Sequence, residues 1–449
     1  MPHITFYASR FSSYSSSPLA TAANRLSNTG VSSKPYDAVI IGGGPGGSAA
    51  ATQLARAGRR VLVLEKERFP RFRIGESLLP YNRQILEEMG VWAKLQGHGF
   101  PRKLGAQFHL GDGSKSLKFV FAEGRFTRHN EIIQVERAVF DEILLDHAGS
   151  CGAEVRQGWT VNRFVAREDH HLIHASSDQG ESNVIEARFL IDASGRANVT
   201  GNQEKLREFH PRLRKLAVFG HFTGVRRDDG DKAGDTVIVR LANRWFWLIP
   251  ISAEKTSIGC VLDRDEFQAA GRPAEEIFNG LVALSPPMSE RLADARLVGR
   301  IQTTTDFSYH NRRLVGPRLL RVGDAAGFMD PIFSAGVYLA MYSGKLAAAV
   351  VDEALRRGDD GAAGLARYEK KVFAGMKLYW ELVEQFYTQP FMEVFMEPRP
   401  KWDIPAAVNA LLAGELEGGW KIRWRMRFFY WLVKLQGRFA FMPRIQFPA

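Results

Sequence analysis

Three glycines and one carboxylate near the start of the chain have the types and spacing that a dinucleotide site needs. They form Gly42-x-Gly44-x-x-Gly47, followed eighteen residues later by Glu65. Gly42 permits a tight turn, Gly44 lets the backbone approach a pyrophosphate, and Gly47 lets a helix pack closely on a strand. A carboxylate at Glu65 can accept hydrogen bonds from both ribose hydroxyls of an adenosine. The spacing therefore predicts that this segment binds a dinucleotide.

Regular elements must hold these residues in place, and the surrounding sequence predicts strand, turn, helix and strand. Residues 38–41 are a continuous apolar run, as expected of a parallel strand buried on both faces, and residues 61–64 form a second run. The helix between them would present the free N–H groups of its first turn to phosphate charge. This order predicts an α/β fold built on a Rossmann βαβ unit.

Two later segments indicate which dinucleotide is bound. Residues 191–195 (IDASG) end an apolar strand, and residues 321–331 (RVGDAAGFMDP) place Asp324 after another apolar stretch and before a helix. With the glycine motif, these segments resemble the glutathione-reductase-type FAD fold. The resemblance implies that Asp324 contacts the ribityl chain and that Arg137 lies beside the flavin phosphates. The sequence contains no second GxGxxG motif, so it shows no obvious separate NAD(P)H domain.

Four further motifs indicate which class of reaction the chain catalyses. They are FPRFRIGESLLP (69–80), FPRKLGAQF (100–108), WFWLIPI (245–251) and DPIFSAGVYLA (330–340). Together with the FAD motifs they resemble the flavin-dependent halogenases, over a stretch from about Tyr36 to Tyr387. The resemblance is closer to the branch that acts on phenols and pyrroles than to the tryptophan halogenases, which are longer.

The resemblance implies a mechanism. A separate flavin reductase supplies FADH2, which reacts with O2, and halide is converted to hypohalous acid. Lys103 matches the family's essential lysine, and its side chain acts either as a hydrogen-bond donor to hypohalous acid or as the nitrogen of a haloamine. Backbone amides of Ser334, Ala335 and Gly336 would hold the halide. The product would be a chlorinated or brominated electron-rich aromatic, a phenol or pyrrole that is free or tethered to a carrier protein.

The same resemblance assigns a set of residues to the cofactor. These are Gly42, Gly44, Pro45, Gly47, Glu65, Lys66, Glu76, Ser77, Arg137, Asp324, Pro331, Gly336 and Val337. No metal site is expected, because Cys151 and Cys260 form no pair motif. Two unpaired cysteines also fit a reducing compartment, and we expect a cytoplasmic protein.

Each candidate has a simpler interpretation. Most lysines are surface residues, so Lys103 taken alone is better explained as a solvated side chain. Its place in a K-x-G-A-x-F segment after the flavin loop reverses this preference and favours the catalytic role. Ser334 and its neighbours could be an ordinary helix start that related hydroxylases share. The family often has a hydroxylated residue where this chain has Ala335, a difference that is harmless only if backbone amides alone bind the halide.

The tryptophans of residues 245–251 pose a question of their own. In a strand, Trp245 and Trp247 point to one face and Phe246 to the other. The resemblance places the indole face, with Ile249 and Pro250, near the flavin, where it would keep substrate away from the cofactor. The simpler interpretation is two core tryptophans on one strand face.

The chain divides into three predicted parts. Residues 1–35 are serine-rich and lack acidic residues, which is typical of a disordered extension or, less often, a targeting segment. Residues 36–350 form the FAD-binding module, interleaved with an antiparallel substrate sheet at about 100–130 and 205–300. Residues 351–449 are helical and form a C-terminal subdomain that shapes the substrate pocket.

The net charge of +11 is concentrated in the two terminal segments. No nucleic-acid motif accompanies it, so nucleic acid is not an expected partner. The last segment, from Trp420 onward, mixes basic and aromatic residues. Three interpretations stay open: a membrane-surface helix, a docking face for an acidic carrier protein, and a helix packed on the core by its aromatic side.

Two other functions fit parts of the sequence. A flavin-dependent monooxygenase or a reductase of the geranylgeranyl reductase type shares the fold and the FAD motifs but needs neither Lys103 nor two indoles in one strand. A membrane-associated flavoprotein without catalytic activity would explain the basic tail and Ala335. Halogenation accounts for the largest number of motifs.

Overall fold

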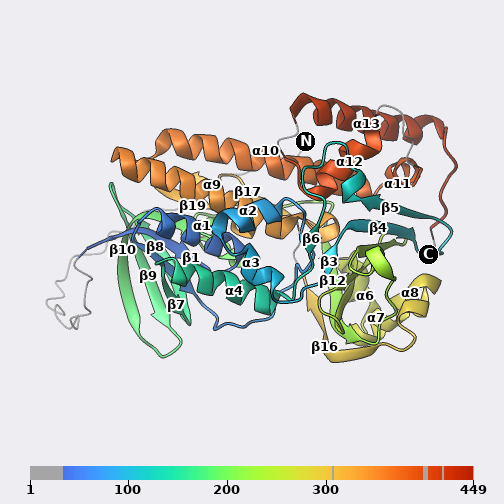
Figure 1. Cartoon of the computed structure of the whole chain (residues 1–449), viewed down its shortest axis with the longest axis horizontal. Helices are drawn as coiled ribbons and strands as arrows, with labels where there is room; N and C mark the ends of the chain where they lie inside the picture. Colours follow the sequence, from blue (N-terminus) through green and yellow to red (C-terminus); the bar gives the residue numbers. More distant parts are fainter. Residues whose placement is uncertain (1–33, 306–307, 398–402, 417–418, 448–449) are drawn as a thin grey trace, which may run out of the picture.

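The computed structural model describes residues 34–305, 308–397, 403–416 and 419–447. The extension predicted at residues 1–35 lies almost wholly outside the described residues. Figure 1 shows two sheets side by side, with long helices running across the top of the molecule. Among the described residues, no helix combines the length and the apolar character needed to cross a membrane.

The first sheet contains the predicted βαβ unit. Its strands are β18 (Val315–Gly316), β19 (Leu319–Arg321), β10 (Ser182–Asp192), β1 (Tyr36–Ile41), β2 (Val61–Glu65) and β7 (Glu154–Gln157), with β9 (His171–Ser177) and β8 (Trp159–Ala166) added at β10. β1 pairs in parallel with β10 and β2. Alternate residues of β1 join two separate apolar clusters, Ile40 one and Val39 the other, so both faces are buried. This is the pattern of a covered parallel sheet.

Helices α1 (Pro45–Arg56) and α4 (Arg137–Ser150) pack against strands of this sheet, and α9 (Ala335–Arg357) packs on α1. α1 and α9 approach closely because small residues meet: a Cβ on Gly344 would lie 2.3 Å from the carbonyl oxygen of Gly46. α9 runs without a break across residue 351, where the C-terminal part was predicted to begin. The division into parts stays a prediction.

The second sheet is antiparallel except for one pair. Its order is β16 (Arg296–Thr304), β12 (Lys215–Thr223), β15 (Thr256–Asp263), β14 (Trp245–Pro250), β13 (Thr236–Arg240), β4 (Gly105–Leu110) and β5 (Ser116–Val120), and β4 and β13 run in parallel. Its strands come from the two ranges in which the sequence predicts a substrate sheet. Shorter helices α6 (Arg264–Ala270), α7 (Ala274–Ala283) and α8 (Pro286–Arg291) lie at the lower right in Figure 1, and α7 packs on one face of this sheet.

The rest of the chain is helical or forms small elements. α10 (Ala362–Phe386), α11 (Gln389–Phe395), α12 (Ile404–Ala413) and α13 (Gly419–Phe439) close the top of the molecule (Figure 1). A two-stranded sheet joins β3 (Arg102–Lys103) to β6 (Ile132–Ile133), and α2 (Asn82–Met89) and α3 (Trp92–Gln96) lie between β2 and β3 in sequence. A third sheet contains β11 (Arg207–Phe209), β17 (Tyr309–Asn311) and β20 (Gly327–Phe328).

Candidate active site

One cavity of about 710 Å³ lies where the two sheets meet. The carboxyl ends of β1 and β2, the segment before α2, strand β14 and the start of α9 all contribute to its walls. Crevices at the carboxyl ends of parallel strands are the usual ligand sites of open α/β sheets. The predicted site residues can therefore be placed against this cavity.

Most of them line it, and four do not. The lining includes Gly42, Gly44, Pro45, Glu65, Lys66, Glu76, Ser77, Arg137, Trp245, Trp247, Ile249, Asp324, Pro331, Ser334, Gly336 and Val337. Gly47, Lys103, Pro250 and Ala335 are absent from the lining. The backbone explains the position of Gly47: a Cβ there would lie 1.9 Å from the carbonyl oxygen of Gly42, so this glycine is the point of contact between turn and helix.

The glycine turn leaves open space where a phosphate would lie. Gly42 has a φ of +98°, which favours glycine. A Cβ on Gly44 would come no closer than 3.5 Å to any other group, here the guanidinium of Arg71. Gly44 is the N-cap of α1 and has no side chain to cap the helix, so the first N–H groups of α1 stay available for an anion.

Two carboxylates in the cavity keep unused acceptor capacity. Glu65 accepts hydrogen bonds from the N–H groups of Gly43 (2.7 Å) and Glu67 (2.9 Å), which fixes its carboxylate at the end of β2. Glu76 pairs through Oε1 with Nε2 of His221 at 2.6 Å, while its buried Oε2 has no hydrogen-bond partner in the described chain. An orphaned acceptor beside a cavity fits a ligand with N–H and O–H donors, and FAD has both. The sequence analysis missed His221, for which no motif gives a signal.

Arg137 and Asp324 carry opposite charges on the cavity wall. Arg137 forms a two-pronged ion pair with Asp141, at 2.7 and 2.8 Å, and donates to the carbonyl oxygen of Ile74. Burial raises the pKa of Asp324 to about 6, against the opposing charges of Arg196 and Arg137. The guanidinium of Arg137 is thus anchored in place, and Asp324 lines the same cavity.

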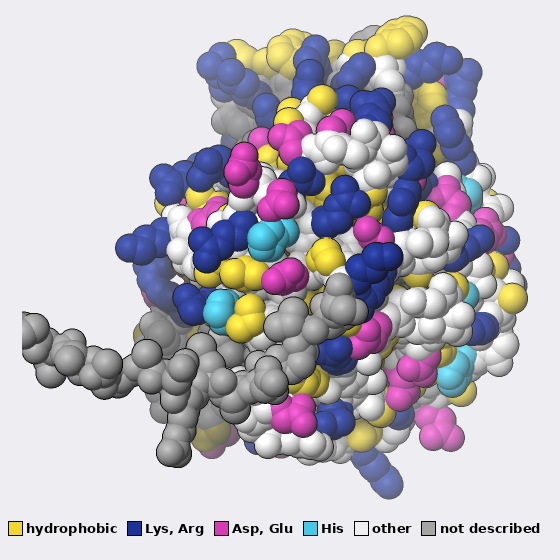
Figure 2. Space-filling view, turned by 90° about the vertical axis from the view of Figure 1, so that its left-hand side faces the viewer, with side chains coloured by type: hydrophobic (Ala, Val, Ile, Leu, Met, Phe, Trp, Pro, Cys, Tyr) yellow, Lys and Arg dark blue, Asp and Glu magenta, His cyan; other side chains and the backbone are white. Residues whose placement is uncertain are grey.

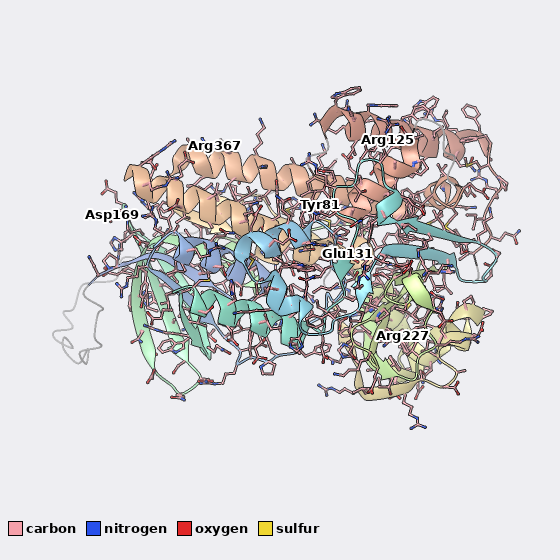
Figure 3. All side chains as sticks on the ribbon, viewed as in Figure 1. Tyr81, Arg125, Glu131, Asp169, Arg227 and Arg367 are labelled. Atoms are coloured by element: carbon pink, nitrogen blue, oxygen red, sulfur yellow. The ribbon has the colours of Figure 1, made fainter. Side chains whose placement is uncertain are left out.

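Lys103 is buried, contrary to the simple expectation for a lysine. Only 2% of it is exposed, and Nζ donates to Oγ of Ser77 (2.8 Å) and to the carbonyl oxygen of Leu78 (2.9 Å). Burial lowers the pKa of Lys103 to about 7, opposed by the charge of Asp235. Figure 3 labels Glu131, whose carboxylate pairs with Arg102, the residue before Lys103. Because Ser77 lines the cavity and Lys103 does not, the Lys103 side chain lies behind the cavity wall at Ser77.

Strand β14 presents its tryptophans to the cavity and packs by its other face. Trp245 and Trp247 line the cavity with ring centres 5.8 Å apart, whereas Phe246 and Leu248 belong to the apolar cluster of the second sheet. Trp247 fits because position 259 is glycine: a Cβ there would lie 2.3 Å from the indole ring. Both tryptophans are at most 4% exposed, so they are packed side chains as well as wall residues.

The segment before α9 is connected to this wall. Asp330 accepts a hydrogen bond from the Tyr387 hydroxyl at 2.6 Å, and that hydroxyl accepts one from Nε1 of Trp245 at 2.8 Å. Burial raises the pKa of Asp330 to about 6. Ser334 has a φ of +56° and precedes the first turn of α9, which starts at Ala335 with no side-chain cap. Backbone N–H groups of that turn are available to an anion. No sequence motif pointed to Tyr387 as a partner.

Comparison with known proteins also indicates an FAD-binding fold. The profile of the FAD binding domain family matches residues 35–377. A 1H-pyrrole-2-carbonyl-[peptidyl-carrier protein] chlorinase of Pseudomonas fluorescens is 32% identical over 413 residues, which cover 87% of this chain and 91% of the relative. A flavin-dependent brominase of known structure superposes with a TM-score of 0.80 at 29% identity, covering 90% of this chain and all of the brominase.

A flavoprotein/dehydrogenase from Cytophaga hutchinsonii shares the fold at a TM-score of 0.81 and 27% identity, covering 89% of this chain and 98% of that protein. The fold is therefore the glutathione-reductase-type FAD fold, which the halogenases share with other flavoproteins. The chlorinase match covers 87% of this chain at a higher identity than either solved structure. The chain belongs to the flavin-dependent halogenases, FAD-dependent enzymes that halogenate aromatic compounds.

Proposed function

We propose that hypohalous acid forms in the large cavity and that Lys103 directs its halogen to an electron-rich phenol or pyrrole. Bound FADH2 and O2 supply the oxidising equivalent that this conversion of halide requires. Gly44, Glu65 and Asp324 hold the cofactor, and the backbone amides at the start of α9 hold chloride or bromide. The burial of Lys103 behind the cavity wall is the single observation that supports this proposal most strongly.

The environment of Lys103 suits a nucleophile. A buried ammonium is disfavoured, so a large fraction of the side chain is the free amine near neutral pH, where an exposed lysine is almost fully charged. A free amine can attack hypohalous acid and hold the halogen on nitrogen. A substrate that is already electron-rich then takes the halogen without a separate base.

The tryptophan wall separates the two halves of the reaction. Trp245 and Trp247 occupy the face of β14 that looks into the cavity, where they stand in the way of a large substrate. A small oxidant passes more easily than an aromatic ring. This arrangement favours halogenation over direct hydroxylation.

We propose that the substrate is delivered on a carrier protein. The Pseudomonas fluorescens relative acts on pyrrole-2-carbonyl attached to a peptidyl carrier protein, and its likeness extends over 87% of this chain. A second relative with the same acyl-carrier substrate, a brominase of Pseudoalteromonas luteoviolacea, is 33% identical over 86% of this chain. The flavin reductase is a second expected partner, because the sequence has a single dinucleotide motif.

The last helix offers a further contact surface. Ile422, Met426 and Phe429 are buried on the side of α13 that meets α11 and α12, so this face packs on the body. Trp420 and Trp431 are 68% and 51% exposed. Five exposed basic side chains of α13 pair with no carboxylate in the part of the chain that the structure describes: Lys421, Arg423, Arg427, Lys434 and Arg438.

Figure 2 shows hydrophobic and basic side chains along the top edge of the molecule, at the height of α13 in Figure 1. Exposed indoles flanked by lysine and arginine are typical of helices that lie in the headgroup region of an anionic membrane. An acidic carrier would account for the cations but not for the exposed indoles. We therefore propose that this face of α13 rests on an anionic membrane surface.

The function is tested by supplying FAD, a flavin reductase, NADH, O2 and either chloride or bromide. Phenols and pyrroles are offered free and as acyl-carrier conjugates, and products are identified by mass spectrometry. Halogenated product is expected, and Lys103→Ala should abolish it while flavin oxidation continues. Lys370→Ala, at an exposed lysine of α10, serves as the matched control. Hydroxylated product without halogen, or full halogenation by Lys103→Ala, would contradict the proposal.

A further inference from the structure

Two hydroxyl groups stand between the cavity and Lys103. Ser77 and Thr236 both line the cavity, and their oxygens lie 2.8 Å apart. Ser77 Oγ also accepts the hydrogen bond from Lys103 Nζ at 2.8 Å. Thr236 begins β13, and Ser77 forms a bridge with Gln134, so three separate segments fix this pair. The shortest hydrogen-bonded connection from the cavity to Lys103 runs through these hydroxyls.

The orientation of the Gln134 amide is determined by its neighbours. Its nitrogen lies 3.0 Å from the carbonyl oxygen of Gly234 and 2.9 Å from Oγ1 of Thr236. Reversing the amide would place two oxygens against each other at Gly234. Gln134 is therefore a donor to Thr236. On the other side, Lys103 gives a second hydrogen to the carbonyl oxygen of Leu78, which can only accept.

One hydroxyl hydrogen is left over. Ser77 and Thr236 carry one hydrogen each, and each receives a hydrogen bond from outside the pair, from Lys103 and from Gln134 respectively. One hydrogen is used within the pair, in whichever direction it runs. The described chain provides no further acceptor within hydrogen-bonding distance of either oxygen. The remaining O–H is free to donate into the cavity that both residues line.

We propose that the Ser77–Thr236 hydroxyl pair binds hypohalous acid by donating this hydrogen to its oxygen, and that the pair presents the halogen to Lys103. The inference rests on the proposed function for the role of Lys103. It makes Ser77 and Thr236 a subsite for the oxidant, placed before the lysine. Ser77, which the sequence placed among the cofactor contacts, is thereby assigned to the oxidant instead.

The transfer step balances with the pair as proton carrier. The amine nitrogen of Lys103 forms a bond to the halogen while the oxygen–halogen bond of hypohalous acid breaks, and the departing oxygen keeps the bonding electrons. That oxygen takes the donated hydroxyl proton and leaves as water. Ser77 recovers a proton from the Lys103 nitrogen, and where Thr236 is the donor it recovers its proton through Ser77. The products are a halogenated lysine nitrogen and one water molecule.

The hydrogen count predicts that the double variant loses far more halogenated product than either single variant. In Thr236→Val, Ser77 loses its acceptor and its own hydrogen becomes the free donor. In Ser77→Ala, Thr236 still has a free hydrogen but Lys103 loses a partner. Only the double variant removes both hydroxyl donors of the pair. We expect halogenated product per FADH2 consumed to fall less than about threefold for Thr236→Val and about tenfold for Ser77→Ala.

The double variant should lose at least about 100-fold, in the range of a deleted oxyanion-hole donor. Hypohalous acid would then escape, and halogenation of monochlorodimedone added to the solution should rise. FAD affinity, measured by flavin fluorescence, should stay unchanged in all three variants. Thr236→Ser keeps a hydroxyl at this position, so combined with intact Ser77 it should avoid the loss seen in the double variant. Ser285→Ala removes an equally buried hydroxyl that bonds to the carbonyl of Gly111, and it controls for loss of a buried hydrogen bond.

Three results would overturn the inference. One is a double variant that gives as much halogenated product per FADH2 consumed as Ser77→Ala does. Another is a loss of product that follows a loss of FAD affinity, which would make the pair a flavin contact. The third is a loss of product without more oxidant reaching monochlorodimedone. A Lys103→Ala variant in the same assay separates failures: if it still halogenates, the proposed function is wrong, and if it is inactive, only the subsite is at fault.

Discussion

The indole nitrogen of Trp245 lies 2.8 Å from the hydroxyl of Tyr387, which in turn donates to Asp330 at 2.6 Å. A strand of the substrate sheet, the segment before α9 and the residue after α10 are thereby joined through one phenol. The cation of Lys215 lies 4.3 Å from the centre of the same ring. The aromatic wall and the loop assigned to the halide are thus held as one unit.

Tyr387→Phe should disconnect this unit. The variant keeps the ring but leaves the Trp245 N–H and one oxygen of Asp330 without their partner, at a cost of about 1 to 3 kcal/mol for each unsatisfied buried group. We expect a lower melting temperature and a KM for halide raised about tenfold. Steady-state halogenation over a range of bromide concentrations measures the second effect. An unchanged KM for halide would show that the phenol supports the fold without positioning the loop.

The pH dependence of halogenation distinguishes the two roles of Lys103. Because burial lowers its pKa to about 7, the amine fraction rises from a minority at pH 6 to a majority at pH 8. A haloamine role therefore predicts product per FADH2 that increases through about pH 7 and levels off. A decrease over the same range would instead support an ammonium that donates a hydrogen bond. Rates of flavin oxidation measured in parallel correct for effects on the cofactor.

The same depressed pKa has a consequence for stability. Between about pH 7 and 10 the unfolded lysine is protonated while the folded one is largely not, so the unfolding free energy rises with pH by up to about 1.4 kcal/mol per unit. Below about pH 7 Lys103 is protonated in both states, so it adds no pH dependence to the unfolding free energy. Lys103→Met should remove that slope, which urea unfolding at several pH values would show. Identical slopes in both proteins would mean that Lys103 is charged in the folded state.

Replacing both Trp245 and Trp247 by alanine should open the wall. We expect halogenated product per FADH2 to decrease and either peroxide release or hydroxylated substrate to increase, because substrate or water gains access to the flavin side. Product analysis by mass spectrometry, with peroxide quantified separately, checks this. Phe246→Leu on the opposite face of β14 is the control for strand packing. If the double variant forms as much halogenated product per FADH2 as the wild type, the tryptophans are core residues only.

Vesicle binding tests the exposed face of α13. The protein should sediment with vesicles of phosphatidylcholine and phosphatidylserine and remain in solution with phosphatidylcholine alone, and added salt should weaken binding. Trp420→Ser with Trp431→Ser should reduce binding about tenfold, since each indole loses its contact with the acyl boundary. Phe209→Ser with Leu284→Ser removes exposed apolar side chains elsewhere and serves as the control. Binding of an acidic carrier in place of anionic vesicles would reassign the face.

The local motifs were predictable from the sequence because neighbouring residues build them. The glycine turn, Pro45 at the start of α1 and Glu65 at the end of β2 depend on backbone conformation and on continuous apolar runs, both of which are visible in consecutive residues. Alternation in β14 likewise sets Trp245 and Trp247 on one face. The resemblance to the halogenases rested on such contiguous segments, and the comparisons confirm it.

Tertiary structure decided which side chains meet. The sequence motif predicted a catalytic Lys103, although a lysine taken alone is expected at the surface. Only the packing of β3 against the segment before α2 buries this side chain and lowers its pKa. The pairing of Ser77 with Thr236 joins residues 159 positions apart, and that of Trp245 with Tyr387 joins residues 142 apart. Hydrogen bonds over such separations leave no periodicity in the sequence. Short contiguous motifs therefore predict the cofactor and the reaction class. The surroundings of the reactive amine are set by contacts that exist only in the folded protein.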